Sequence, residues 1–323
     1  MNYGIPYMGS KSNICKNICA LFPSADHFYD LFGGGFSISH FMLEHRSKDY
    51  KHFHFNEIRP GICELIKDAI AGKYSYDNFK PRWISREEFF EKKELNPYIK
   101  MCWSFGNNGK DYLFSKDIEQ YKKSMHNALI FNDFDDLAKK TLGMDKFKDG
   151  YSISERRLFL RNKAIVNNNN LSRGELETFQ QLEQLQQLQQ LERLQRLQQL
   201  EQLQRLEQMD KLNFYNLSYE QIEIKPNSTI YCDIPYKGTG EYDKNKLFNR
   251  EKFLSWADQQ TNPVFISEYQ INDGRFKEIY KISKRSIMCG GVKDKIKSIE
   301  KVYVNKAGLV KLIQLNNQKI GLK

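Results

Sequence analysis

The stretch His27-Phe-Tyr-Asp-Leu-Phe32 runs directly into Gly33-Gly34-Gly35, and this junction decides the fold. The first six residues predict a buried strand, and residues Phe36 to His45 have helical spacing. His52-Phe-His-Phe-Asn-Glu57 alternates and predicts a second strand, with another helix beginning near Pro60. A strand–loop–helix–strand–helix order is typical of a parallel α/β sheet.

The same pattern returns late in the chain. Ser228–Asp233 and Pro263–Tyr269 predict strands, with a helix expected over Asn249–Gln260 and further strand-like stretches within 275–283 and 300–305. Residues 73–165 instead are rich in Lys, Arg, Tyr, Phe and Asn, lack clear alternation and predict mainly helices. We therefore expect a sheet domain split into 1–72 and 213–323, an inserted helical domain over 73–170 and a low-complexity insertion over 171–212.

The low-complexity stretch carries a leucine at every third position from Leu182 to Leu206. Gln, Glu and Arg fill most of the gaps, so a long helix is expected. A step of three residues turns an α-helix by about 300°, so the leucines circle the axis instead of forming a coiled-coil seam. We interpret this stretch as an expanded repeat at a tolerant surface point. A partner-binding or self-associating helix is the alternative.

The composition suits a protein with a polyanionic partner. The chain has 323 residues, 40% of them hydrophobic, and a net charge of +10, which favours contact with phosphates but also fits any basic soluble protein. Six scattered cysteines without zinc-site spacing predict reduced, mostly buried thiols and no metal. Neither a signal peptide nor a membrane span is apparent, so we expect a cytoplasmic protein that does not contact membranes.

The glycine turn and Glu57 together suggest a nucleoside site. Glycines after a buried strand let a ligand approach the backbone, and Glu57 follows Gly35 by 22 positions, where a carboxylate can bind ribose hydroxyls. Ile38 breaks the pyrophosphate fingerprint, so S-adenosylmethionine fits better than a dinucleotide. The alternative is a tight turn with a solvated Glu.

Pro6-Tyr-Met-Gly-Ser-Lys11 precedes a helix expected over residues 10–22. Gly9 and Ser10 offer backbone donors there, and Lys11 offers a positive charge for a carboxylate. An ordinary capped helix with a surface lysine is the alternative.

The strand Ile230-Tyr-Cys-Asp-Ile-Pro-Tyr236 ends in the tetrad Asp233-Ile-Pro-Tyr236. Asp233 and the Ile234 carbonyl can accept the two hydrogens of an exocyclic amine, which favours the pyramidal geometry that attack on a methyl group requires. Pro235 would hold the turn and Tyr236 would stack on the base. A base in duplex DNA must flip out to reach such a site. An Asp-initiated turn without function is the alternative.

Four segments in order make the chain similar to the Dam-type (D12 class) family of DNA adenine-N6 methyltransferases. They are Tyr7-Met-Gly-Ser-Lys11, Asp30-Leu-Phe-Gly-Gly-Gly35, Asn56-Glu57 and Asp233-Ile-Pro-Tyr236. The resemblance implies a Rossmann-like S-adenosylmethionine-dependent methyltransferase sheet and a target-recognition domain in the slot of residues 73–170. Phe265-Ile-Ser-Glu-Tyr269 also resembles a strand segment of the family.

The resemblance also implies residue roles. Tyr7 and Lys11 stand where an aromatic residue and a lysine contact the cofactor. Glu57 replaces the usual Asp that binds ribose, and Ile234 replaces a Pro of Asp-Pro-Pro-Tyr while keeping its carbonyl. The expected cofactor-binding residues are Tyr7, Gly9, Ser10, Lys11, Asp30, Phe32, Gly33, Gly34, Gly35, Glu57 and Asp233, and the catalytic residues are Asp233, Ile234, Pro235 and Tyr236.

The expected partner is double-stranded DNA, bound by a chain that we expect to be monomeric unless residues 171–212 self-associate. Trp103-Ser-Phe-Gly-Asn-Asn-Gly-Lys110 offers amides that can read adenine and a lysine for phosphate, although a loop of solvated residues is the alternative. The predicted DNA contacts are Asn107, Asn108, Lys110, Lys116, Lys122 and Lys123.

Two other functions remain open from sequence. A catalytically impaired, methylase-derived DNA-binding protein would explain Ile234 and the leucine repeat. A nicotinamide-dependent oxidoreductase is disfavoured by the incomplete glycine fingerprint and the tetrad. Restriction–modification and the protection of phage DNA are both possible settings for a methyltransferase.

Overall fold

The computed structural model describes residues 2–75, 79–167, 196–197, 199–207, 209–236, 248–285 and 297–321. These residues form two compact units. The first comprises Met1–Gly4, Gly9–Cys63 and Leu206–Lys323, and the second comprises Ile5–Met8 and Glu64–Arg205. The helix expected for 171–212 lies outside the described residues up to position 195. Among the helices that are described, none combines the length and apolarity needed to cross a bilayer.

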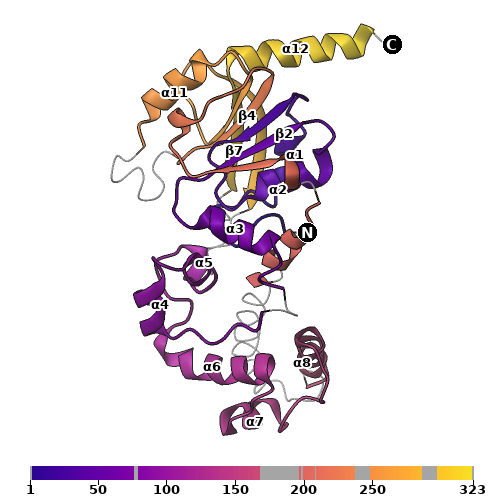
Figure 1. Cartoon of the computed structure of the whole chain (residues 1–323), viewed down its shortest axis with the longest axis vertical. Helices are drawn as coiled ribbons and strands as arrows, with labels where there is room; N and C mark the ends of the chain where they lie inside the picture. The colour runs from indigo at the N-terminus through magenta and orange to yellow at the C-terminus, as the bar shows by residue number, and fades with distance from the viewer. Residues whose placement is uncertain are drawn as a thin grey trace. The chain divides into compact units, whose positions relative to one another are not determined.

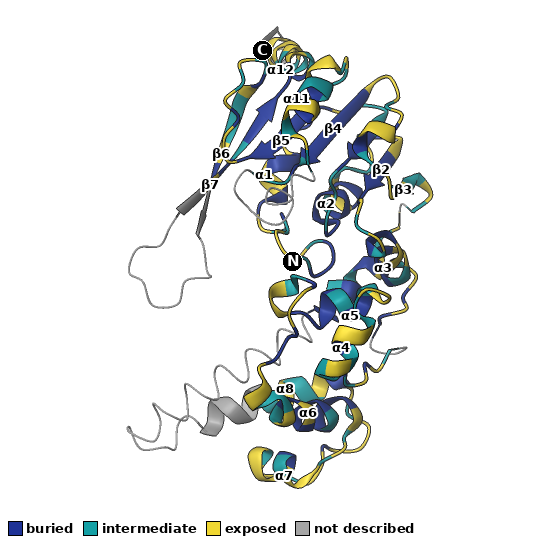
Figure 2. Cartoon of the chain, turned by 90° about the vertical axis from the view of Figure 1, so that its left-hand side faces the viewer, coloured by how far each residue is buried: buried dark blue, intermediate teal, exposed yellow. Residues whose placement is uncertain are grey.

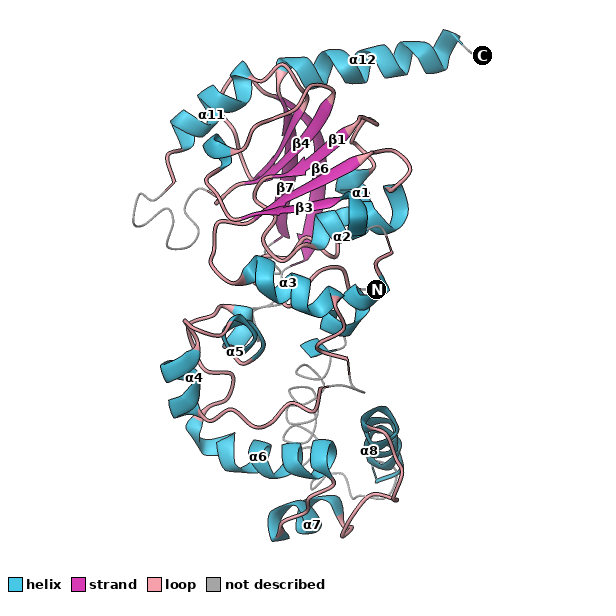
Figure 3. Cartoon of the chain, viewed as in Figure 1, coloured by secondary structure: helices cyan, strands magenta, loops and turns pink. Residues whose placement is uncertain are grey.

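The first unit is built on a seven-stranded sheet with the order β3-β2-β1-β4-β5-β7-β6 (Figures 1 and 3). The five neighbouring strands β3, β2, β1, β4 and β5 are parallel to one another, whereas β7 runs antiparallel to both β5 and β6. The strands are β1 His27–Asp30, β2 His52–Asn56, β3 Leu212–Tyr215, β4 Ser228–Asp233, β5 Val264–Glu268, β6 Lys277–Arg285 and β7 Lys297–Val304. This mostly parallel sheet is consistent with a methyltransferase fold.

The strand order reverses at β1, which pairs with β2 on one side and β4 on the other. Asp30 of β1 is in register with Tyr231 of β4. Because both strands are parallel, their carboxyl ends open on the same edge of the sheet. Ligands of open α/β sheets bind at such a switch point. The Gly33–Gly35 turn and the Asp233–Tyr236 turn therefore follow neighbouring strands.

Each face of the sheet is covered by apolar side chains, as alternation along a strand requires. On one face, Tyr29, Ile230 and Cys232 belong to a buried cluster with Phe253 of α11. On the other face, the Phe22 ring lies 5.1 to 5.5 Å from the rings of Phe28, Tyr231 and Phe265. Figure 2 shows the central strands largely in the buried colour. The helices of this unit include α1 Cys15–Cys19, α2 Ser37–Arg46, α11 Arg250–Gln259 and α12 Lys306–Gly321, with 3₁₀ turns at Met209–Lys211 and Tyr219–Gln221.

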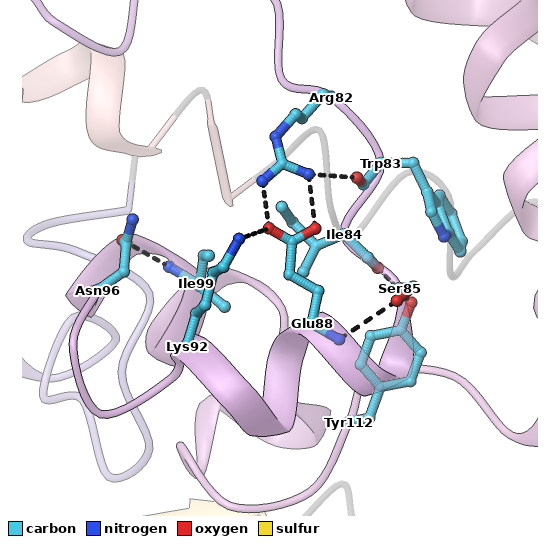
Figure 4. A network of polar contacts seen from close by, with 9 residues as sticks. All are labelled: Arg82, Trp83, Ile84, Ser85, Glu88, Lys92, Asn96, Ile99 and Tyr112. Carbon is cyan, nitrogen blue, oxygen red and sulfur yellow. Dashed lines mark hydrogen bonds and ion pairs between the residues drawn. The ribbon is translucent and has the colours of Figure 1, made fainter.

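The described regular elements of the second unit are helical. They include α4 Arg86–Lys92, α5 Pro97–Cys102, α6 Lys116–Phe131, α7 Asp136–Leu142, α8 Ile153–Asn167, the 3₁₀ turns Phe105–Asn107 and Leu203–Arg205, and most of α3 Ile62–Ile70. Residues 196–197 and 199–202 are also helical. Side chains cap the starts of α4 and α5, since Ser85 accepts from the Glu88 amide and Asn96 from the Ile99 amide (Figure 4). Tyr112 donates to the Ile84 carbonyl at 2.6 Å and joins the start of α4 to the strand-like segment after α5.

Several details differ from the sequence-based expectations. The helix expected over 10–22 is shortened to Cys15–Cys19, because Ser12 accepts from the Tyr3 amide and Ser10 from the Ser12 amide, which competes with helical bonding. Strand β3 was not expected. Cys15, Cys19, Cys63, Cys102 and Cys232 are buried thiols as predicted, and Cys289 lies outside the described residues.

Candidate active site at the carboxyl ends of β1 and β4

The turn after β1 is held in one shape by close packing. A Cβ on Gly33 would lie 2.1 Å from the Phe55 ring, and Gly34 has a φ of 51°, which glycine adopts without strain. Phe36 also has a positive φ of 70°, a conformation that costs a bulky residue about 1–2 kcal/mol. Its fully buried ring packs edge-on against Phe55 at 5.0 Å, which offsets that strain.

Glu57 joins the turns that follow β1 and β2. Its carboxylate accepts a hydrogen bond from the Gly34 amide at 2.8 Å and one from the Arg59 amide at 2.9 Å. The residue is only 6% exposed. The carboxylate predicted to bind ribose therefore lies beside the glycine turn, at the position that its spacing suggested.

The amino-terminal segment packs on the same turn. A Cβ on Gly4 would lie 2.1 Å from the Gly35 carbonyl oxygen, so only glycine fits there. Ser37, at the start of α2, accepts from the Lys11 amide at 3.2 Å. These contacts bring Lys11 to the edge of the sheet where β1 and β4 end.

Lys11 joins a buried charged cluster with the tetrad. Its Nζ lies 2.7 Å from Asp233 Oδ2, 3.3 Å from Glu300 Oε1 and 4.8 Å from the centre of the Tyr236 ring. Tyr236 donates its hydroxyl to the same Glu300 oxygen at 2.7 Å. The side chain of Asp233 is 21% exposed, and those of Lys11 and Glu300 are 7% and 2% exposed. Asp233 is therefore the most accessible of these three side chains.

The charges in this cluster depend on one another. Burial alone would lower the pKa of Lys11, but Asp233 and Glu300 outweigh it and the pKa is raised. Burial raises the pKa of Asp233, and Lys11 opposes this effect by stabilising the carboxylate. Burial and the nearby carboxylates raise the pKa of Tyr236, which therefore stays protonated and can donate to Glu300. Sequence reasoning placed Lys11 at a cofactor carboxylate, whereas the structure places its ammonium beside Asp233.

Glu300 was missed by sequence reasoning. It lies on β7, far from every motif, and is 1% exposed. The available signal was alternation, because Glu300 shares a strand face with Val302 and Val304, which are fully buried. A glutamate is almost never fully buried unless it is paired, so this position indicates a buried partner.

The tetrad turn is braced by residues that follow it in the chain. Arg250 of α11 donates to the Pro235 carbonyl at 2.6 Å and pairs with Glu268, which is 1% exposed. The Ile234 side chain is itself 1% exposed and belongs to the core cluster under α11. This bracing supplies rigidity beside Ile234, which stands where Asp-Pro-Pro-Tyr has its first proline.

Asp30 places a second carboxyl group near the glycine turn. It is fully buried at the end of β1, and Oδ2 accepts from Ser39 Oγ at 2.7 Å. Within the described residues, Oδ1 has no hydrogen-bond partner. Burial raises the pKa of Asp30 to about 7, and Asp233 and Glu57 add to this effect. A buried acceptor without a partner is a candidate ligand-binding atom.

A comparison with known families identifies one that matches nearly the whole chain. A family model described as D12 class N6 adenine-specific DNA methyltransferase matches residues 7–317. The chain belongs to this family. The resemblance inferred from the four motifs is confirmed, and membership supports DNA adenine methylation as the general activity. No curated protein matched the chain.

The D12 methyltransferase carries its predicted DNA-reading residues on a hairpin of the second unit. Ser104 and Tyr112 form an antiparallel bridge, and the Phe105 amide donates to the Asp111 carbonyl at 2.8 Å. Asn108 accepts from the Lys110 and Asp111 amides and donates to Asp111 Oδ2, so its amide group stabilises the hairpin tip. Tyr7 also lies in the second unit, and its cofactor contact stays a prediction.

The lysines predicted to meet phosphate fall into two groups. Lys110, Lys116 and Lys123 are exposed, as a phosphate contact requires. Lys122 is 1% exposed, on the face of α6 that also buries Met125, so the prediction of a DNA contact for Lys122 does not agree with the structure. Neighbouring helix positions point about 100° apart, which explains why Lys122 and Lys123 have opposite environments.

Proposed function

We propose that the chain transfers a methyl group from S-adenosylmethionine to N6 of adenine in double-stranded DNA, with the target base flipped out of the helix. The observation that carries this proposal is the position of Asp233 and Tyr236 beside the glycine turn, at the switch point between β1 and β4. Family membership supports the general reaction, and the geometry supports these residues as the place where it occurs.

The buried charges of the site fit a cationic cofactor. Asp30, Asp233 and Glu300 carry three carboxyl groups against the single ammonium of Lys11. An excess of acceptors favours a ligand with a sulfonium and an ammonium group. Asp30 Oδ1 is our candidate acceptor for the ammonium, and Glu57 our candidate for the ribose hydroxyls, since a carboxylate accepts several hydrogen bonds.

S-adenosylmethionine, when bound, supplies the electrophilic methyl group. Asp233 and the Ile234 carbonyl would accept hydrogen bonds from the two N–H groups of the adenine N6 amine. These bonds would direct the nitrogen lone pair at that methyl group. Lys11 contributes by holding Asp233 Oδ2 at 2.7 Å and favouring its ionised form. Tyr236, oriented by Glu300 and by an edge-on contact with Tyr269 at 4.5 Å, would stack on the base. Positioning and electrostatic orientation are then the main sources of rate.

Residues of the second unit would bind the duplex. Lys110, Lys116 and Lys123 offer exposed charges for phosphates, whereas Asn107 is half-buried at the hairpin tip and its Oδ1 atom is buried. Asn108 can contribute by maintaining the hairpin, given its bonds to Lys110 and Asp111. We propose that the chain acts as a monomer.

The test is methyl transfer from tritiated S-adenosylmethionine to unmethylated duplex DNA. We expect incorporation by the wild-type chain and none by Asp233→Ala, while DNA binding measured by fluorescence anisotropy persists in both. Asp258→Ala removes an exposed carboxylate of α11 and is the matched control. DNA binding without incorporation by the wild type would instead favour the catalytically impaired DNA-binding protein.

A further inference from the structure

The last turns of the leucine repeat are part of the packed second unit. Leu197, Leu200 and Leu203 are at most 1% exposed, and Arg196 is 7% exposed. On an α-helix, three leucines spaced by three residues span only about 120°, so they share one face. Arg196 precedes Leu197 by about 100° and therefore falls on that same face. The three-residue spacing of the leucines therefore prevents a long coiled-coil seam but allows three consecutive leucines to share one buried face.

Arg196 uses its guanidinium to bind two backbone carbonyls. Nη1 donates to the Cys102 carbonyl at 2.9 Å and to the Ser104 carbonyl at 3.0 Å. Cys102 is the last residue of α5, where helical carbonyls lack intrahelical partners and a positive charge is favoured. Arg196 thus joins the end of α5 to the beginning of the hairpin.

The hairpin receives this constraint through Ser104. The Ser104 hydroxyl accepts from the Gly109 amide at 2.9 Å, so the residue whose carbonyl Arg196 binds also holds the far side of the tip. Gly109 has a φ of 70°, which makes the tip a tight turn. Phe105 is 56% exposed and Lys110 is also exposed, whereas Asn107 and Asn108 between the two anchors are half-buried.

We propose that Arg196 is a positioning residue for DNA recognition, and that the end of the repeat holds the Ser104–Tyr112 hairpin in the shape that reads the target sequence. This inference rests on the proposed function of the hairpin as a DNA-reading element. Arg196 itself is buried and acts through Ser104. The repeat is therefore a functional part of the second unit over residues 196–205, in contrast to the tolerant surface insertion expected from its sequence.

The test compares Arg196→Met and Arg196→Lys with Arg205→Met in the full-length chain. Arg205 is exposed and belongs to the same segment, so its replacement removes an equal charge without touching the hairpin anchors. Sequence preference is measured by single-molecule sequencing of plasmid DNA from cells that express each variant, and by competition binding between the preferred duplex and a scrambled one.

We expect Arg196→Met to lower the preference for the target sequence by roughly ten- to hundred-fold, as the loss of charged hydrogen bonds implies. Arg196→Lys keeps the charge and can reach one carbonyl, so we expect an intermediate loss. Arg205→Met is expected to match the wild type. A purely structural role would lower the melting temperature and the active fraction without changing the preference.

An unchanged preference in a folded Arg196→Lys or Arg196→Met protein would overturn the proposal. The same holds if Arg205→Met relaxes the preference as strongly as Arg196→Met. If the wild type binds DNA selectively but methylates none, the proposed chemistry fails, and the binding competition still decides the role of Arg196.

Discussion

Replacing Glu300 by Gln tests whether the charged cluster orients the tetrad. The change keeps the shape of the side chain but removes the negative charge that accepts from Tyr236 at 2.7 Å and pairs with Lys11 at 3.3 Å. Hydrogen bonds to charged groups contribute about 1.5–3 kcal/mol, against about 1 kcal/mol for neutral ones. The difference of about 0.5–2 kcal/mol predicts that kcat falls by roughly 2- to 30-fold, with little change in the KM for DNA.

The assay is tritiated methyl transfer at saturating cofactor, with the melting temperature measured in parallel. Glu278→Gln is the matched control, because Glu278 lies on the paired strand β6 and forms the more exposed ion pairs with Lys301 and Lys281, which contribute little. A double-mutant cycle adds Tyr236→Phe. We expect an interaction of about 1 kcal/mol or more between Glu300 and Tyr236. Wild-type kcat in Glu300→Gln, or additive effects in the cycle, would refute the positioning role.

Four further changes address the rest of the site. Burial raises the pKa of Asp30 to about 7, so we expect cofactor affinity, measured by calorimetry, to fall as the pH drops through that value. Asp30→Asn is expected to remove this pH dependence. An equal dependence in the variant would exclude Asp30 as the acceptor for the ammonium group. Glu57→Ala is expected to weaken cofactor binding by about ten-fold or more through the lost hydrogen bonds, and unchanged affinity would remove Glu57 from the site. Arg250→Met is expected to lower kcat by about ten-fold because the Pro235 carbonyl loses its donor, with Asp233→Ala as the inactive reference; full activity would show that the turn needs no brace. Deleting residues 182–193, which are four whole triplets, is expected to leave methylation intact. Deleting residues 196–205 is expected to abolish methylation, because it removes the buried leucines. Equal activity in both deletion variants would contradict a structural role for residues 196–205.

The central strands were predictable because they are buried on both faces. Ser228–Asp233 has the same bounds in sequence and structure, and its first five residues are buried, as expected for a central parallel strand. β3 escaped prediction because Leu212–Tyr215 is a short edge strand of half-buried and exposed residues. Alternation of apolar and polar residues identifies a long strand, but four residues of an edge strand are too few to show it.

The candidate site was predictable where consecutive residues supply the chemistry. The tetrad and the glycine turn are local, and the pairing of β1 with β4 in the structure places them after neighbouring strands. The partners of the tetrad are not local, because Lys11, Arg250 and Glu300 reach it only through tertiary packing. The environment of Lys122 was likewise inaccessible, since which face of α6 is buried depends on the elements packed against it.

The brace on the tetrad has an evolutionary consequence. When the carbonyl of Pro235 is restrained by an arginine from a later helix and Ile234 is anchored in the core, the motif no longer depends on two consecutive prolines for its geometry. The residue at the second motif position can then change while the turn keeps its geometry. A search that demands Asp-Pro-Pro-Tyr would overlook this chain, although its tetrad is held in place by Arg250.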